Sequence, residues 1–154
     1  MQTLFEQEYP KCEKSLFLVA LSYLHNTEDA RDVLQDAALA AYRSVDKLRE
    51  PAYFKTWMTR IVINKSKNFL KARRHTEELR DDISLFSTVP ETELEIVDAI
   101  CRMKRESAVY ISLRFYNDMN YNEVASALRQ PVSTVKYRTR KALAELKNLL
   151  EGDV

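Results

Sequence analysis

Glycine is almost absent from this chain of 154 residues, because Gly152 is the only one. Tight turns and phosphate-binding loops depend on glycine, so a turn-rich β fold and a Gly-rich nucleotide-binding loop are both excluded. Cysteine and histidine are scarce too, with two of each and no CxxC or Cys/His spacing. We therefore predict no metal site and no cofactor, and interpret both cysteines as reduced packing residues of a cytoplasmic protein.

Long apolar runs are also missing, and none approaches the roughly 20 residues of a membrane span. No basic start followed by an apolar stretch marks a secretion signal, so we expect no membrane insertion. Leu, Ala, Glu, Lys and Arg dominate instead, which favours an all-α protein. With 45% hydrophobic and 31% charged residues, the chain is expected to fold around a core.

The net charge of +1 hides three blocks of charge. Residues 1–75 carry 13 basic and nine acidic side chains, residues 76–98 carry one and eight, and residues 99–154 carry ten and six. Two basic blocks therefore flank an acidic one. Such asymmetry says more about binding partners than the total charge does.

Apolar residues recur at helical spacing in most of the chain. The predicted helices are 3–25, a second that starts after an N-cap at Thr27, 52–73, 94–104, 106–116, 121–128 and 134–150. The polar, acidic stretch between the third and fourth helices has no such period and contains Pro90, which is typical of a linker. We predict an all-α fold with two small helical domains, 1–75 and 94–154, joined by a flexible acidic linker, 76–93.

The segment NYNEVASALRQPVSTVKYRTRKALAEL has the pattern of a helix-turn-helix. Asn120 and Glu123 have the spacing of a capping box, and the small Ala125 lets a second helix approach. A proline ends the first helix, and Ser133 can cap the second. Arg129 stands where such turns usually have glycine, because that residue often needs a positive φ, at a cost of about 1 kcal/mol for any other side chain.

The second helix of this motif has one basic face. At 100° per residue, Val135 and Ala142 lie on one side, and most of the charges of STVKYRTRK lie on the other. A recognition helix meets the major groove at such a face, where Arg and Lys pair with phosphate or guanine. A merely solvated basic face is the alternative. The candidate DNA-binding residues are Ser133, Thr134, Lys136, Tyr137, Arg138, Arg140 and Lys141.

The third helix carries a second basic stripe. Residues 63–75 contain five basic side chains and no acid, which is typical of a surface that meets a phosphate backbone. A basic exposed helix without a ligand is again the alternative. Met58, Val62 and Phe69 lie elsewhere, toward a core. The stripe comprises Arg60, Asn64, Lys67 and Lys71, with Asn68 at its edge.

Aromatic residues precede this stripe, and aromatic side chains can stack on nucleic-acid bases. Their spacing on an apolar face indicates instead that Phe54 and Trp57 belong mostly to the core, whereas the role of Tyr53 stays open.

Three segments together resemble bacterial RNA polymerase sigma factors of the extracytoplasmic-function group. They are EDARDVLQDAALAAY, FKTWMTRIVINKSKNFLKARR and YNEVASALRQPVSTVKYRTRKAL, and their order and spacing fit over residues 5–150. The resemblance implies a chain without catalysis of its own, whose partners are core RNA polymerase, promoter DNA and a dedicated anti-sigma factor. The first domain would bind core polymerase and the minus-ten element, and the second the minus-thirty-five element.

Site residues follow from the same resemblance. Asp32, Gln35 and Asp36 would dock on core polymerase, although without the resemblance they form only a solvated polar face. The stripe of the third helix would contact minus-ten DNA. Lys47 and Arg49 lie in a loop, DKLREPA, that resembles the one capturing a flipped minus-ten base, but this loop lacks the glycine common there.

The acidic stretch predicted as a linker allows three interpretations. Glu77, Glu78, Asp81 and Asp82 would be repelled by DNA but not by a basic protein channel, so the linker would thread through the polymerase, contact the basic C-terminal face or act as a solvated tether. A nuclease is one rival function, with Asp81 and Asp82 as a metal-binding pair, but their place in a predicted linker disfavours it.

A helix-turn-helix repressor or activator acting without polymerase is the serious rival, and it would need its own dimer interface or ligand pocket.

Overall fold

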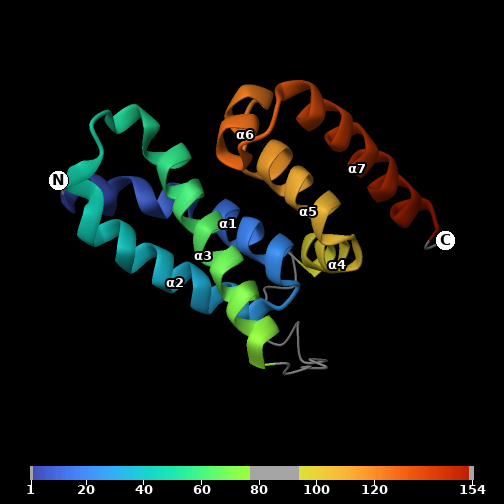
Figure 1. Ribbon diagram of the computed structural model, residues 1–154, viewed down its shortest axis with the longest axis horizontal. Helices are drawn as coiled ribbons and strands as arrows, with labels where there is room; N and C mark the ends of the chain where they lie inside the picture. The colour runs from blue at the N-terminus through green and yellow to red at the C-terminus, as the bar shows by residue number, and fades with distance from the viewer. Residues whose placement is uncertain (1, 77–93, 153–154) are drawn as a thin grey trace.

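The computed structural model describes residues 2–76 and 94–152, and within these ranges every regular element is a helix. The predicted all-α fold is confirmed. Figure 1 shows α1–α3 on one side of the molecule and α4–α7 on the other. The acidic segment 77–93, with the four carboxylates of the predicted linker, lies outside the described residues. No helix in the described ranges is both long and apolar enough to cross a membrane.

The first group of helices is α1, α2 and α3, which contact one another pairwise. Two short 3-10 turns connect α2 to α3, and the proline at the start of the second turn suits a first helical position. The third helix therefore begins two residues later than predicted and ends three residues later. The elements are α1 (Gln2–Leu24), α2 (Thr27–Ser44), η1 (Val45–Lys47), η2 (Pro51–Tyr53) and α3 (Phe54–Thr76).

The corner between α1 and α2 differs from the prediction in one detail. Asn26, not Thr27, is the N-cap of α2, because its Oδ1 accepts a hydrogen bond of 2.9 Å from the amide of Asp29. Thr27 is the first helical residue. The chain reaches this cap through His25, whose φ of 52° lies in the left-handed region.

The second group of helices contains the predicted helix-turn-helix. α5 contacts α7, and its last turn widens into a π-helical turn, η4, so the predicted helix 106–116 is an α-helix followed by this turn. The helix predicted at 121–128 is found with these bounds. The elements are α4 (Leu94–Arg102), α5 (Arg105–Ile111), η4 (Ser112–Tyr116), α6 (Tyr121–Leu128) and α7 (Val132–Gly152).

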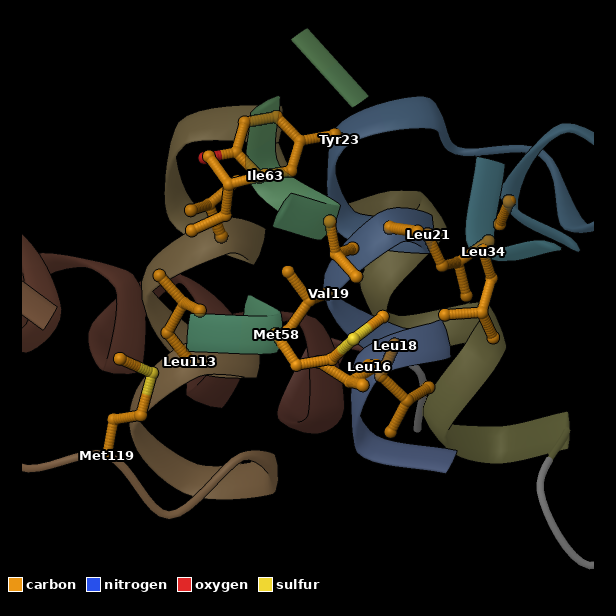
Figure 2. Close-up of a cluster of buried hydrophobic side chains, with 14 of the residues drawn as sticks. Leu16, Leu18, Val19, Leu21, Tyr23, Leu34, Met58, Ile63, Leu113 and Met119 are labelled. Atoms are coloured by element: carbon orange, nitrogen blue, oxygen red, sulfur yellow. The ribbon is translucent and has the colours of Figure 1, made fainter. Parts of the chain in front are cut away.

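One apolar core runs through both groups of helices. Figure 2 shows Leu113 and Met119, from the second group, beside Val19 of α1 and Met58 of α3. All four side chains are at most 1% exposed. α1 stands between the groups, since it contacts α2 and α3 as well as α4, α5 and η4. The outer faces of α2, α3 and α7 lie away from this core and are exposed.

His25 predicts how stability depends on pH. Burial, and secondarily the charge of Arg105, lower the pKa of His25 below its ordinary value of about 6.5. Below that pH the unfolded chain binds a proton that the folded chain resists, so the free energy of unfolding falls as pH decreases. We expect His25→Asn, which tolerates the left-handed backbone, to lose less stability between pH 7.5 and 5.5 in urea titrations. An equal loss in both proteins would contradict this assignment.

Candidate nucleic-acid interface

The recognition helix α7 presents the predicted basic face to solvent. Ser133, Lys136, Arg138, Arg140 and Lys141 are exposed. Tyr137 is 59% exposed, and Thr134 is half-buried. The opposite side of α7 packs inward through Val135, Thr139 and Ala142, each 0% exposed. The helical period thus separates the charges from the core as the sequence indicates.

The start of α7 corrects one prediction. The helix begins at Val132, and the amide of Val135 donates to the carbonyl of Pro131 at 3.1 Å. Pro131 therefore occupies the N-cap position, and Ser133 lies in the first turn instead of capping it. Ser133 is exposed at the N-terminal end of the helix, where the helix dipole attracts phosphate.

The turn between α6 and α7 has the geometry that the sequence predicts. Asn120 and Glu123 form the capping box, with bonds of 2.8 and 2.9 Å. Arg129 has φ 56° and ψ 50°, so a residue with a side chain adopts the left-handed conformation. The amide of Gln130 donates to Ala125 and that of Arg129 to Ser126, which is the Schellman pattern of a helix end. These bonds hold the turn despite the strain at Arg129.

A buried tyrosine supports the turn from below. The hydroxyl of Tyr110, on α5, hydrogen-bonds the Gln130 side chain and accepts a bond of 3.3 Å from Arg138. This bond is the main cause that raises the pKa of Arg138. Tyr110 thus links the turn to the recognition helix, and Arg138 is held by the protein as well as exposed. No pattern within one segment could predict this contact, because the partners come from three separate segments.

Arg114 is a second residue that the sequence analysis missed. Its guanidinium lies 5.3 Å from the centre of the Phe115 ring and 5.1 Å from that of the Tyr121 ring. Lys136 Nζ lies 5.9 Å from the centre of the same Tyr121 ring. Cation–π contacts of this kind hold positive charge on an aromatic surface. Arg114 therefore extends the positive surface from the start of α7 toward η4. Only the fold brings these positions together.

The stripe of α3 is exposed along its whole predicted length. Arg60, Asn64, Lys67, Asn68 and Lys71 all face solvent. The other side of α3 is buried, with Met58 and Val62 at 0% and Phe69 half-buried. Arg73 does not extend the stripe freely, because its Nη2 pairs with Asp29 Oδ2 at 3.1 Å.

The aromatic residues at the start of α3 divide as their spacing predicts. Phe54 is 3% exposed and Trp57 is half-buried. Tyr53, whose role the sequence leaves open, is 64% exposed and lies in η2, directly before α3. Lys47 and Arg49, from the connection between α2 and α3, are also exposed.

The outer face of α2 has a different character. Asp32, Gln35 and Asp36 are exposed together, and Val33, Leu34 and Ala37 are buried on the other side. Leu39 lies one turn after the acidic residues on the exposed side and is 50% exposed. An acidic face repels the phosphate backbone of DNA, but it is complementary to a basic surface on a protein partner.

These features define an all-α protein of the helix-turn-helix class, with one basic surface on α7, another on α3 and an acidic surface on α2. Comparisons with known families then narrow the class. Residues 9–76 match Sigma-70 region 2, and residues 104–148 match Sigma-70 region 4.

Two relatives illustrate the similarity in sequence. The chain is 30% identical over 142 residues to the ECF RNA polymerase sigma-E factor of Haemophilus influenzae, covering 80% of this chain and 75% of the relative. It is 27% identical over 135 residues to the RNA polymerase sigma factor SigV of Bacillus subtilis, covering 85% and 81%.

Two solved structures share the fold. CnrH, in complex with the cytosolic domain of CnrY, has a TM-score of 0.70 and 25% identity, over 100% of this chain and 92% of that one. The sigma factor RpoE of Bartonella quintana, in complex with the anti-sigma factor NepR, has a TM-score of 0.74 and 19% identity, over 97% and 98%.

The chain belongs to the sigma-70 family, as an RNA polymerase sigma factor of the extracytoplasmic-function (ECF) group. As a sigma factor it directs core RNA polymerase to promoter DNA and initiates transcription. The resemblance noted in the sequence is confirmed, and the repressor or activator alternative is set aside.

Proposed function

We propose that three helix faces divide the work of this sigma factor. α2 docks on core RNA polymerase through Asp32, Gln35 and Asp36. α3 contacts the minus-ten element, and α7 the minus-thirty-five element. The observation that carries this proposal is the separation of charge: two basic faces lie on different helices of different groups, and the acidic face lies on a third.

The proposal divides the chain into residues 1–75 for core and minus-ten binding, 76–93 as linker and 94–154 for minus-thirty-five binding. Two separate basic surfaces suit two promoter elements that are spaced along the DNA. A repressor with a single recognition helix needs only one of them.

Recognition of the minus-thirty-five element by α7 follows from its exposed groups. Lys136, Arg140 and Lys141 are exposed and carry the charge to pair with phosphates or guanine edges in the major groove, while Tyr137 and Thr134 supply phosphate or thymine-methyl contacts. Ser133 at the helix start donates to a phosphate. Arg138 contributes charge from a position fixed by Tyr110.

Recognition of the minus-ten element by α3 uses the stripe Arg60, Asn64, Lys67, Asn68 and Lys71. Lys and Arg neutralise the backbone, and the two amides suit base edges of an opened strand. Lys47 and Arg49 lie before η2, where they reach a base turned out of the stack. Exposed Tyr53 offers a ring for that base.

The remaining partners follow from family membership. Sigma factors supply specificity, and the polymerase supplies the chemistry, so this chain carries no catalytic residue of its own. It works in the cytoplasm with core polymerase. Because one similar structure is a complex of a sigma factor with an anti-sigma factor, we propose that an anti-sigma factor also holds this chain inactive.

Run-off transcription tests the function directly. Purified core polymerase and bacterial genomic fragments are incubated with and without the chain. New discrete start sites that require the chain are expected, and their upstream sequences define its promoter. Tight duplex binding by the chain alone, with no new start sites, would reject the sigma-factor assignment in favour of a repressor or activator.

Lys136→Ala combined with Arg140→Ala tests the face of α7. Affinity for a minus-thirty-five duplex should fall roughly thirtyfold, about 2 kcal/mol. If both residues contact phosphates, the slope of log affinity against log salt should decrease by roughly 1.8. Affinity for core polymerase, measured by fluorescence anisotropy, should stay the same. Equal loss of affinity for DNA and for core polymerase would contradict the assignment of this face to DNA binding.

Asp36→Arg tests the docking face of α2. The substitution reverses an exposed charge, so the fold survives and affinity for core polymerase should fall roughly tenfold as charge complementarity is lost. Glu28→Arg is the matched control, because it makes the same change at an exposed position in the first turn of α2. Unchanged core affinity in Asp36→Arg, or the same loss in the control, would place the docking surface elsewhere.

A further inference from the structure

The first turns of α7 are held at both ends by one side chain of another helix. Most of the candidate DNA contacts of α7 lie in residues 133–137, called the reading segment below. Gln130 stands three residues before this segment, in the turn, and Arg138 follows it directly. Both side chains hydrogen-bond the hydroxyl of Tyr110, on α5. The two attachment points therefore bracket the reading segment.

The Tyr110 hydroxyl can serve both partners at once, because it has one proton to donate and lone pairs that accept. It donates to Oε1 of Gln130 and accepts a bond of 3.3 Å from Nη1 of Arg138. Tyr110 is only 3% exposed, so its ring is fixed by the core around it. The packing of this ring therefore sets the position at which both bonds form.

The bond to Gln130 supports a strained turn. Arg129 has a left-handed backbone, which is unfavourable for a residue with a side chain. The backbone bonds of the turn, from the amides of Arg129 and Gln130, run back to carbonyls of α6. The Gln130 side chain adds a bond to α5. The start of α7 is thus placed relative to two helices instead of one.

The flank of α7 that carries Arg138 borders a cavity. α5 lies beside α7 (Figure 1), and the cavity of about 600 Å³ between them is lined by Tyr110 and Arg138 together with Lys104, Glu145 and other side chains. Two polar links cross this flank: the bond from Arg138 to Tyr110, and a bond of 3.3 Å from the Lys104 amide to Glu145, farther along α7. Because apolar packing does not fill this flank, these links restrict how far α7 can rotate against α5.

Base recognition depends on such a restriction more than phosphate binding does. A hydrogen bond to a base edge weakens steeply when its angle or distance changes. The attraction of Lys and Arg to the phosphate backbone varies slowly with distance and carries no direct sequence information. A small displacement of the reading segment therefore lowers discrimination between DNA sequences before it lowers non-specific affinity.

We propose that Tyr110 is a positioning residue for recognition of the minus-thirty-five element, because its hydroxyl holds the reading segment in register with the bases. This role rests on the proposed contact of α7 with that element. Tyr110 itself is buried on α5 and belongs to none of the three proposed contact faces. It therefore contributes to sequence discrimination and not to charge.

The test removes the link without touching a proposed DNA contact. Tyr110→Phe deletes the hydroxyl and keeps the buried ring and the net charge. Gln130→Ala deletes one partner of the hydroxyl and also leaves the charge unchanged. Tyr23→Phe is the matched control, because it makes the same change in a similarly buried tyrosine, 6% exposed, on α1. Circular dichroism and urea titration report whether each variant is folded.

Fluorescence anisotropy on the full chain measures affinity for two duplexes. One duplex carries the minus-thirty-five element of the promoter found by run-off transcription, and the other carries the same bases in scrambled order. The ratio of the two affinities is the sequence discrimination. The slope of log affinity against log salt reports how many phosphates the chain contacts.

We expect Tyr110→Phe to lower affinity for the promoter duplex roughly three- to tenfold, the effect of one or two lost hydrogen bonds. Affinity for the scrambled duplex and the salt slope should stay the same, because no phosphate contact is removed. Gln130→Ala should act in the same direction. The double variant should bind no more weakly than Tyr110→Phe, because both changes break the same link. Tyr23→Phe should bind like the natural chain.

Unchanged discrimination in folded Tyr110→Phe would overturn this role, and so would an equal loss of affinity for both duplexes. Additive losses in the double variant would show that Gln130 acts without Tyr110. If Tyr110→Phe does not fold, the discrimination of Gln130→Ala decides. The variant with Lys136→Ala and Arg140→Ala separates the two proposals: if it loses promoter affinity while Tyr110→Phe keeps its discrimination, only the role of Tyr110 fails, and if it keeps promoter affinity, the proposed role of α7 fails too.

Discussion

The end of α1 has no side that faces water, and the rest of the molecule is arranged around this constraint. All seven residues from Leu18 to Leu24 are buried. A helix that is apolar on every side must be enclosed, because each large aliphatic side chain gains about 1.5–3 kcal/mol from burial. α2 and α3 cover one side, and α4, α5 and η4 cover the other. Both groups of helices are thus needed to bury α1.

Enclosing α1 leaves the outer helices free to carry ligands. α2, α3 and α7 each have one buried and one polar face, and the sign of the charge differs between them. The acidic face of α2 repels nucleic acid and suits a protein, whereas the basic faces of α3 and α7 attract phosphate. One ion pair, between Arg73 and Asp29, ties the end of α3 to the start of α2 and neutralises one of the positive charges of α3.

Sequence periodicity predicted the features that depend on one helix at a time. The exposed faces of α2, α3 and α7, the bounds of α6 and its capping box all follow from spacing within a single segment. The family, too, could be seen in three motifs and their order. The roles of individual residues in binding polymerase and DNA remain predictions.

Features that depend on distant partners could not be predicted. The N-cap of α2 was missed for a local reason: Asn26 and Thr27 are neighbours of types that both cap helices, and the bond from the Asp29 amide identifies Asn26. The stacking of Arg114 on Tyr121 and the support of Arg138 by Tyr110 join residues from separate helices. In the sequence, Asn117 looks like an ordinary loop residue. Its two hydrogen-bond partners, Ser15 and Thr59, are far away in the chain, so the buried position of its amide could not be predicted.

The two-sided burial of α1 has a consequence for synthesis. The ribosome releases α1, α2 and α3 first, and α5 follows about 80 residues after the end of α1. At roughly 5–20 residues per second, the face of α1 that α5 covers stays open for about 4–16 s in every nascent chain. During that interval the chain exposes an apolar strip suited to chaperones, and a chain that stops before α5 keeps this strip permanently. Protein quality control can thus distinguish incomplete copies of this sigma factor from complete ones before they meet polymerase.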